Sequence, residues 1–125
     1  MLERIILGHL VGDYLLQNKA MMLNKSKKGV KGALWCTLHC AIYTAVVCLF
    51  LWTANPWIIL AVFLSHWPID RWSLAVKWMQ LIKSRDPHET YFSKEIDAAF
   101  YAIVYVAIDN TAHILLIWLA AKLLM

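Results

Sequence analysis

Apolar residues in this chain form long runs that are separated by short polar segments. No Asp, Glu, Lys or Arg occurs between residues 32 and 56, and the runs 5–18, 57–76 and 98–121 each contain only one or two of them. A helix needs about 20 apolar residues to cross the hydrocarbon core of a membrane. The pattern therefore predicts four transmembrane helices. They lie near 2–24, 32–54, 57–83 and 95–124.

The composition agrees with a membrane protein and excludes several other classes. Hydrophobic residues make up 62% of the 125 residues, and charged residues only 16%. Soluble domains carry about 25% charged residues, and a core of this size could not bury so much apolar surface. Apolar residues are too abundant, and Gly and Pro too rare, for a disordered chain, a disulfide scaffold or a fibrous repeat. We therefore expect an all-α fold, an integral membrane four-helix bundle, in a single domain over residues 1–125.

The basic residues predict how the helices cross the membrane. Lysines cluster in or beside the loop between the first two predicted helices, at positions 19, 25, 27, 28 and 31. Further cations lie in or beside the loop between the last two, at 77, 83, 85 and 94. The short turn at 53–56 has none. Because cytoplasmic loops are rich in Lys and Arg, we expect both basic segments in the cytoplasm and the termini outside. The cations then serve orientation and contact with membrane lipids, and we expect no nucleic-acid partner.

Histidine and aspartate recur at one spacing within the apolar runs. His9 precedes Asp13 by four residues, His66 precedes Asp70 by four, and a further aspartate precedes His113 by four. Residues four apart lie on the same face of a helix. Three such pairs among five histidines would arise in roughly half a per cent of shuffled chains. The spacing therefore indicates a shared role.

These groups also fall at similar depth in the predicted membrane spans. At 1.5 Å per residue, they lie in or near a middle slab of a hydrocarbon core that is about 30 Å thick. Groups at this depth must face the bundle interior, because lipid would leave them unsatisfied. The sequence thus predicts a convergent cluster. Its members are His9, Asp13, His39, His66, Asp70, Asp109 and His113.

Three interpretations of this cluster stay open. Imidazole and carboxylate ligands suit a divalent transition metal, with zinc expected first and manganese or iron as alternatives, and helical bundles build such sites from facing helices. Seven ligands would fit two ions, or one ion whose imidazoles are oriented by further carboxylates. The second interpretation is a proton or ion relay in a transporter or channel. The third is a set of hydrogen bonds that only holds the helices together.

Several neighbouring residues add to this picture. Gly8 and Gly12 have the spacing of closely packed helices. Pro68 lies between the third-helix histidine and aspartate and is expected to kink that helix. Gln17 and Asn110 are expected to supply amide hydrogen bonds beside the cluster.

The same segments resemble a family of small bacterial and phage membrane proteins known as domain of unknown function 3307. The resemblance rests on residues 8–17, which carry the family's opening His-x-x-Gly-Asp-aromatic-x-x-Gln signature, and on the histidine-containing second helix. It also rests on residues 65–70, with the family's His-x-x-x-Asp pattern, and 109–113, with Asn110 where Gln is usual. Tyr43, expected to be a packing residue, stands where a second histidine often appears. The resemblance implies a multi-pass protein of the bacterial inner (cytoplasmic) membrane and no known activity.

A more distant similarity to inner-membrane metal-dependent hydrolases suggests a reaction. We expect a metal-dependent hydrolase that acts on a lipid-derived phosphoester, which can reach the site laterally from the membrane. Asp13, Asp70 and Asp109 are the candidate catalytic residues, because a carboxylate that is not bound to metal can serve as a general base. A proton- or ion-coupled transporter or channel remains the alternative, and a homo-oligomer remains open.

Overall fold

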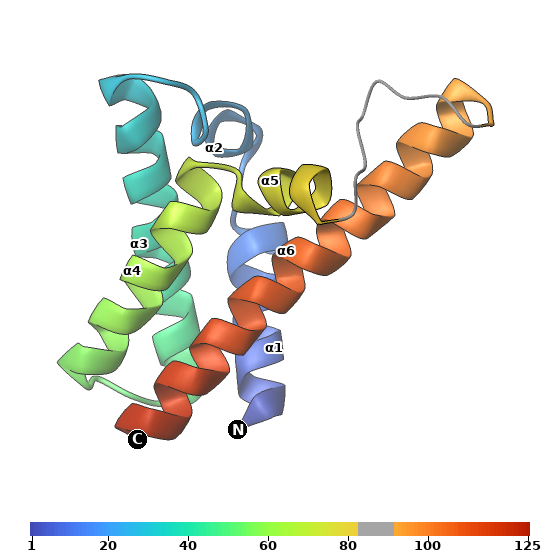
Figure 1. Cartoon of the computed structure of the whole chain (residues 1–125). Coiled ribbons are helices and arrows are strands. Elements are labelled where there is room, and N and C mark those ends of the chain that lie inside the picture. The colour runs from blue at the N-terminus through green and yellow to red at the C-terminus, as the bar shows by residue number, and fades with distance from the viewer. Residues whose placement is uncertain (83–91) are drawn as a thin grey trace.

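The computed structural model describes residues 1–82 and 92–125, and most of them lie in helices (Figure 1). No strand occurs in these two ranges, so the predicted all-α class is confirmed for the part of the chain that the structure describes. The elements in chain order are α1 (Leu2–Leu10), a π-helical turn η1 (Val11–Leu15), α2 (Lys19–Asn24), α3 (Val30–Leu51), α4 (Pro56–Arg71), α5 (Leu74–Leu81) and α6 (Lys94–Leu124).

Four of the helices pack around a common interior. Helix α1 contacts α3 and α6, α3 contacts α4, and α4 contacts α6, so the contacts close a ring. Both termini lie at one end, and α2 lies toward the other (Figure 1). The α3–α4 turn lies beside the C-terminus, because the Asn55 side chain donates a hydrogen bond of 3.0 Å to the backbone carbonyl of Leu124.

Helices α3 and α6 agree closely with the sequence pattern. Both are long and apolar enough to cross a membrane, by length and composition. Helix α3 follows Gly29, whose φ of 89° is favoured by glycine, and is followed by Trp52 in the left-handed region. Helix α6 starts after Ser93, whose hydroxyl accepts a hydrogen bond from the Ile96 backbone N–H. Their observed bounds differ from the predicted ones by only a few residues.

The prediction of one continuous helix over residues 2–24 is wrong. The chain leaves the helix after η1, whose wider turn is closed by a 3.1 Å hydrogen bond from the Leu16 N–H to the Val11 carbonyl. It resumes at α2, where the Asn18 side chain accepts a hydrogen bond of 2.9 Å from the Met21 N–H. Asparagine favours such a capping position over a helix interior. The apolar run therefore folds as two helical pieces with a break at 16–18.

The prediction of one helix over residues 57–83 is also wrong. Helix α4 ends at Arg71 and α5 begins at Leu74, because Ser73 between them adopts a left-handed φ of 49°. Pro68 lies inside α4, and the break follows it rather than falling at it. The 16 residues of α4 extend about 24 Å, which is shorter than a hydrocarbon core. The predicted helix end at 83, together with Lys83 and Arg85, lies outside the described residues.

The apolar core fills the half of the bundle nearer the termini. It comprises Ile5, Tyr43, Val47, Cys48, Leu51, Ile58, Val62, Ile117 and Ala121. Close packing of α1 on α3 accompanies it, because a Cβ atom built on Gly8 would lie 3.2 Å from the Val47 Cα atom. A Cβ atom on Gly12 would lie 2.7 Å from a ring carbon of Tyr43. The predicted role of both glycines in close helix packing is confirmed.

Candidate metal centre

Six of the seven sequence-predicted residues meet just beyond this apolar core. Along each helix the polar residue lies one or more turns from the core residues, toward the end that carries α2. Their metal-ligating atoms form two groups, and within each group all these atoms lie within 4.8 Å of one another. The first group contains Asp13 from η1, His39 from α3, and His66 and Asp70 from α4; the second contains Asp13 again, with Asp109 and His113 from α6.

The first group has the spacing of ligands around a single ion. The Nε2 atom of His39 lies 3.1 Å from Asp13 Oδ1, 3.1 Å from Asp70 Oδ2 and 3.1 Å from His66 Nε2. The Nε2 atom of His66 lies 3.5 Å from Asp13 Oδ1 and 3.2 Å from Asp70 Oδ2. Donors at about 2.0–2.2 Å from a tetrahedral zinc ion are separated by about 3.3–3.6 Å. The residues present therefore fit a four-coordinate transition metal.

The second group is more open. The Nε2 atom of His113 lies 3.8 Å from Asp109 Oδ2 and 3.7 Å from Asp70 Oδ1. Both distances exceed a hydrogen bond. The imidazole itself is held in place, because its centroid lies 4.0 Å from that of His66.

His9 belongs to neither group. One ring nitrogen, Nδ1, lies 2.8 Å from the Tyr43 hydroxyl and 3.4 Å from Asp13 Oδ2. The other, Nε2, lies 2.7 Å from Asn110 Oδ1, which also accepts a hydrogen bond of 3.0 Å from the Tyr14 hydroxyl. The structure thus places His9 beside Asp13, with both ring nitrogens of His9 held by Tyr43 and Asn110. Asn110 supplies the amide contact that the sequence predicted.

Tyr43 has a larger part in the centre than packing alone. Its ring stacks on the imidazole of His66, with centroids 3.7 Å apart and planes inclined by 22°. Its hydroxyl contacts His9. Tyr43 thereby fixes His66 in the first group and His9 beside it. Two sequence features are consistent with this role: Tyr43 lies one helical turn from His39, and it stands where a second histidine often appears in the family that the sequence resembles.

Lys25 is a charged neighbour of the cluster that the sequence did not reveal. Its ammonium group donates a hydrogen bond of 2.7 Å to Asp70 Oδ2, the oxygen that also faces His39. The sequence suggested only a membrane-orienting cation in a basic loop. The break at 16–18 makes the difference, because it lets α2 return the chain to the cluster, so that the residue following α2 reaches a carboxylate of α4.

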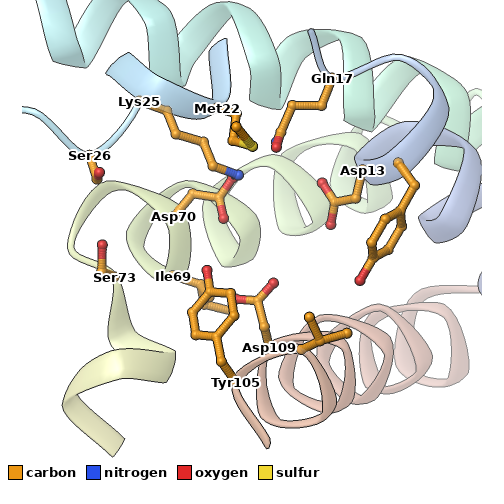
Figure 2. A pocket seen from close by; sticks show the side chains of 12 residues that line it. Asp13, Gln17, Met22, Lys25, Ser26, Ile69, Asp70, Ser73, Tyr105 and Asp109 are labelled. Atoms are coloured by element: carbon orange, nitrogen blue, oxygen red, sulfur yellow. The ribbon is translucent and has the colours of Figure 1, made fainter. Parts of the chain in front are cut away.

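A cavity of about 340 Å³ opens onto the carboxylates. Figure 2 shows Asp13, Asp70 and Asp109 facing this space, with Lys25 against Asp70 and Tyr105 beside Asp109. The imidazoles of the two groups lie deeper, since His39, His66 and His113 are at most 2% exposed. Gln17, the second predicted amide, also lines the cavity, and its nitrogen lies 3.5 Å from His39 Nε2.

Comparisons with known proteins agree with the resemblance seen in the sequence. The model of a family described as "Protein of unknown function (DUF3307)" matches residues 1–125, the whole chain. No curated protein matches the chain, and no solved structure does. The more distant similarity to metal-dependent hydrolases is not shown by these comparisons.

Proposed function

Because the chain belongs to the DUF3307 family, whose function is unknown, we propose its function from the geometry of the centre. The protein is an integral membrane protein that holds a divalent transition metal between Asp13, His39, His66 and Asp70. With this ion it hydrolyses a lipid-derived phosphoester. The observation that carries the proposal is that the Nε2 atoms of His39 and His66 lie 3.1 Å apart and each lies 3.1–3.5 Å from a carboxylate oxygen of Asp13 and of Asp70.

The distribution of polar and apolar side chains supports a membrane setting. Four histidines and Asp70 are buried, whereas Leu49 is 67% exposed, Ile103 66% and Leu123 78%. Such an arrangement is inverted relative to a soluble domain, where large exposed apolar patches are rare. Lipid around α1, α3, α4 and α6 would cover these side chains. We propose that the protein is located in the bacterial inner membrane and that its chain crosses this membrane several times.

The donor set favours zinc among the candidate metals. Two imidazole nitrogens and two carboxylate oxygens in a compact four-coordinate arrangement suit Zn²⁺. Manganese and iron accept the same ligand types. When bound, such an ion polarises a phosphoryl oxygen and activates water.

The residues around the cavity are suited to a phosphoester. The Lys25 ammonium can bind phosphate oxygens, and Ser26, Ser73 and Tyr105 add hydroxyl groups to the same lining. Asp109, the third predicted catalytic acid, faces this cavity as well. The cavity lies at the end of the bundle that carries the basic segment, so the headgroup of a lipid in the cytoplasmic leaflet is the proposed substrate portion.

The structure favours this function over a relay across the membrane. A relay needs polar groups or water along the whole path. Toward the termini, the interior beyond His9 is filled by Ile5, Val47, Leu51 and Ile117, which belong to the apolar core. Among the described residues, the polar cluster therefore opens to only one end of the bundle, through its cavity. This is the arrangement of a binding site and not of a path across the membrane.

Elemental analysis of the full chain, purified in mild detergent without chelators, tests the metal. We expect at least one equivalent of a transition metal per chain. His39→Ala and His66→Ala should each lose about one equivalent, because each removes a ligand of the first group. Cys48→Ala, a buried substitution in the apolar part of α3, is the matched control and should keep the wild-type content. Less than a tenth of an equivalent in the wild type would refute the metal centre.

Phosphate release from phospholipid substrates in mixed micelles tests the reaction. We expect the metal-loaded wild type to release phosphate or a phosphorylated headgroup, and His66→Ala to lose this activity by at least a hundredfold. A protein that binds metal but hydrolyses none of a panel of lipid phosphomonoesters and phosphodiesters would refute the hydrolase while leaving the metal centre in place.

A further inference from the structure

Asp13 belongs to both ligand groups, and from this we infer a second metal site. We propose that the centre is dinuclear: a second divalent cation binds between Asp109 and His113, and the Asp13 carboxylate bridges it to the first. The inference rests on the proposed function, because it takes the first group as an ion site. The ligating atoms of Asp13, Asp109 and His113 lie within 4.8 Å of one another.

A buried nitrogen without a partner points to this second ion. His113 is 2% exposed, and its Nε2 atom has no hydrogen-bond partner although it faces two carboxylates. A buried nitrogen without a hydrogen-bond partner destabilises the fold. Its distances of 3.7 Å to Asp70 and 3.8 Å to Asp109 are too long for hydrogen bonds. Two donors at about 2.0–2.2 Å from one ion lie about 2.8–4.4 Å apart, depending on the angle between them.

The two aspartates that join the groups are arranged as bridges. Asp70 directs Oδ2 toward His39 and His66, at 3.1 and 3.2 Å, and directs Oδ1 toward His113. Asp13 is the member that both groups share, and its Oδ1 atom is buried without a hydrogen-bond partner. Dinuclear hydrolytic sites hold two ions about 3.5–4 Å apart. Asp70 faces both groups, and Asp13 belongs to both. These two carboxylates are therefore placed to connect two neighbouring ions.

The second site lies nearer to the cavity than the first. The side chain of Asp109, the carboxylate found only in the second group, is 18% exposed, whereas that of Asp70, the carboxylate found only in the first, is 4% exposed. Asp109 also lines the cavity (Figure 2). The second ion is therefore the one that meets the phosphoester, and it exchanges with solution more readily than the first.

Titration of metal-depleted full chain in detergent with Mn²⁺ tests the second site. We expect two equivalents in the wild type, and an electron paramagnetic resonance spectrum that shows two exchange-coupled ions. Asp109→Asn and His113→Ala should each bind one equivalent, with the spectrum of an isolated ion. Ile117→Ala, a buried change one turn further along α6, should keep both ions and their coupling. Asp109→Asn is nearly isosteric and partly exposed, so it remains informative if His113→Ala fails to fold.

The outcomes separate this inference from the function on which it rests. One equivalent in the wild type, unchanged in Asp109→Asn, would overturn the second site and leave the first intact. Two equivalents without coupling would also overturn it, because the ions would then lie apart. No bound Mn²⁺ in the wild type, with none of Zn²⁺ or Fe²⁺ either, would refute the proposed function itself.

Discussion

The ammonium group of Lys25 lies 2.7 Å from Asp70 Oδ2, and the same oxygen lies 3.1 Å from the Nε2 atom of His39. A fixed cation therefore occupies one side of a carboxylate that the proposed first ion would also use. The two positive charges compete for this oxygen. The position of Lys25 at the rim of the cavity also allows the ammonium to turn toward an anionic substrate once a metal has bound.

Lys25→Met should raise the affinity for metal. The substitution removes the competing charge and keeps a side chain of similar length, so the ion no longer has to weaken a charge-assisted hydrogen bond of about 1.5–3 kcal/mol. We expect the dissociation constant for Zn²⁺ to fall about tenfold, which corresponds to about 1.4 kcal/mol. Competition with a fluorescent chelator measures it. Lys27→Met, an exposed change in the same segment, is the control, and weaker binding by Lys25→Met would contradict the competition.

Changes at Tyr43 should separate its two contacts. Tyr43→Phe keeps the ring that stacks on His66 and removes the hydroxyl that contacts His9, whereas Tyr43→Leu removes both. Groups that orient metal ligands commonly contribute 10–100-fold in affinity. We expect a loss of up to about tenfold for the first variant and about 100-fold for the second, measured by the same chelator competition. Equal affinities for the two variants would show that the stacking does not position His66.

Gly12→Ala should disturb the centre, whereas Gly8→Ala should disturb only packing. The new Cβ atom at Gly12 would lie 2.7 Å from a ring carbon of Tyr43, so that ring must move away from its place against His66. At Gly8 the new atom would meet Val47 and Phe50, at 3.2 and 3.3 Å. Overpacking costs about 1–3 kcal/mol. We expect a lower melting temperature for both variants in detergent, and at least tenfold weaker metal binding for Gly12→Ala alone.

The cluster could be predicted because its physical cause is visible in the sequence. Ionisable groups in an apolar helix must face one another, and a four-residue spacing fixes the face. Asp70, His66 and His113 therefore meet as expected. The bounds of α3 and α6 were predictable for a related reason, since each is a long apolar run that begins beside a glycine or a polar residue.

The break at 16–18 and the roles of Lys25 and His9 could not be predicted, because they depend on contacts that no local sequence pattern encodes. The break at 16–18 follows from a π-helical turn and an asparagine cap, which compete with an apolar run that also suits a helix. That break alone brings Lys25 to Asp70. His9 and Asp13 satisfy the same spacing rule as the other pairs, yet Asn110 and Tyr43 occupy both nitrogens of His9. Spacing predicts which side chains share a face, and tertiary partners decide which of them are free to bind an ion.

Cysteine labelling should show on which side of the membrane each end of α3 lies. Lys27→Cys precedes α3, and Ala54→Cys lies in the turn that follows it; both positions are exposed. The three native cysteines are at most 6% exposed, so the wild type is an unlabelled control. On intact bacterial cells with a permeable outer membrane, an impermeant maleimide should label Ala54→Cys and should reach Lys27→Cys only after lysis, because basic loops stay in the cytoplasm.

The labelling pattern also decides from which side the centre is reached. Lys25 and Ser26 line the cavity and lie within two residues of Lys27, so protection of Lys27→Cys would place the cavity at the cytoplasmic leaflet. Labelling of both variants from the same side would mean that α3 does not cross the membrane, and it would contradict the transmembrane proposal. The reverse pattern would keep the crossing but turn the cavity outward. The proposed phosphoester would then have to come from the outer leaflet.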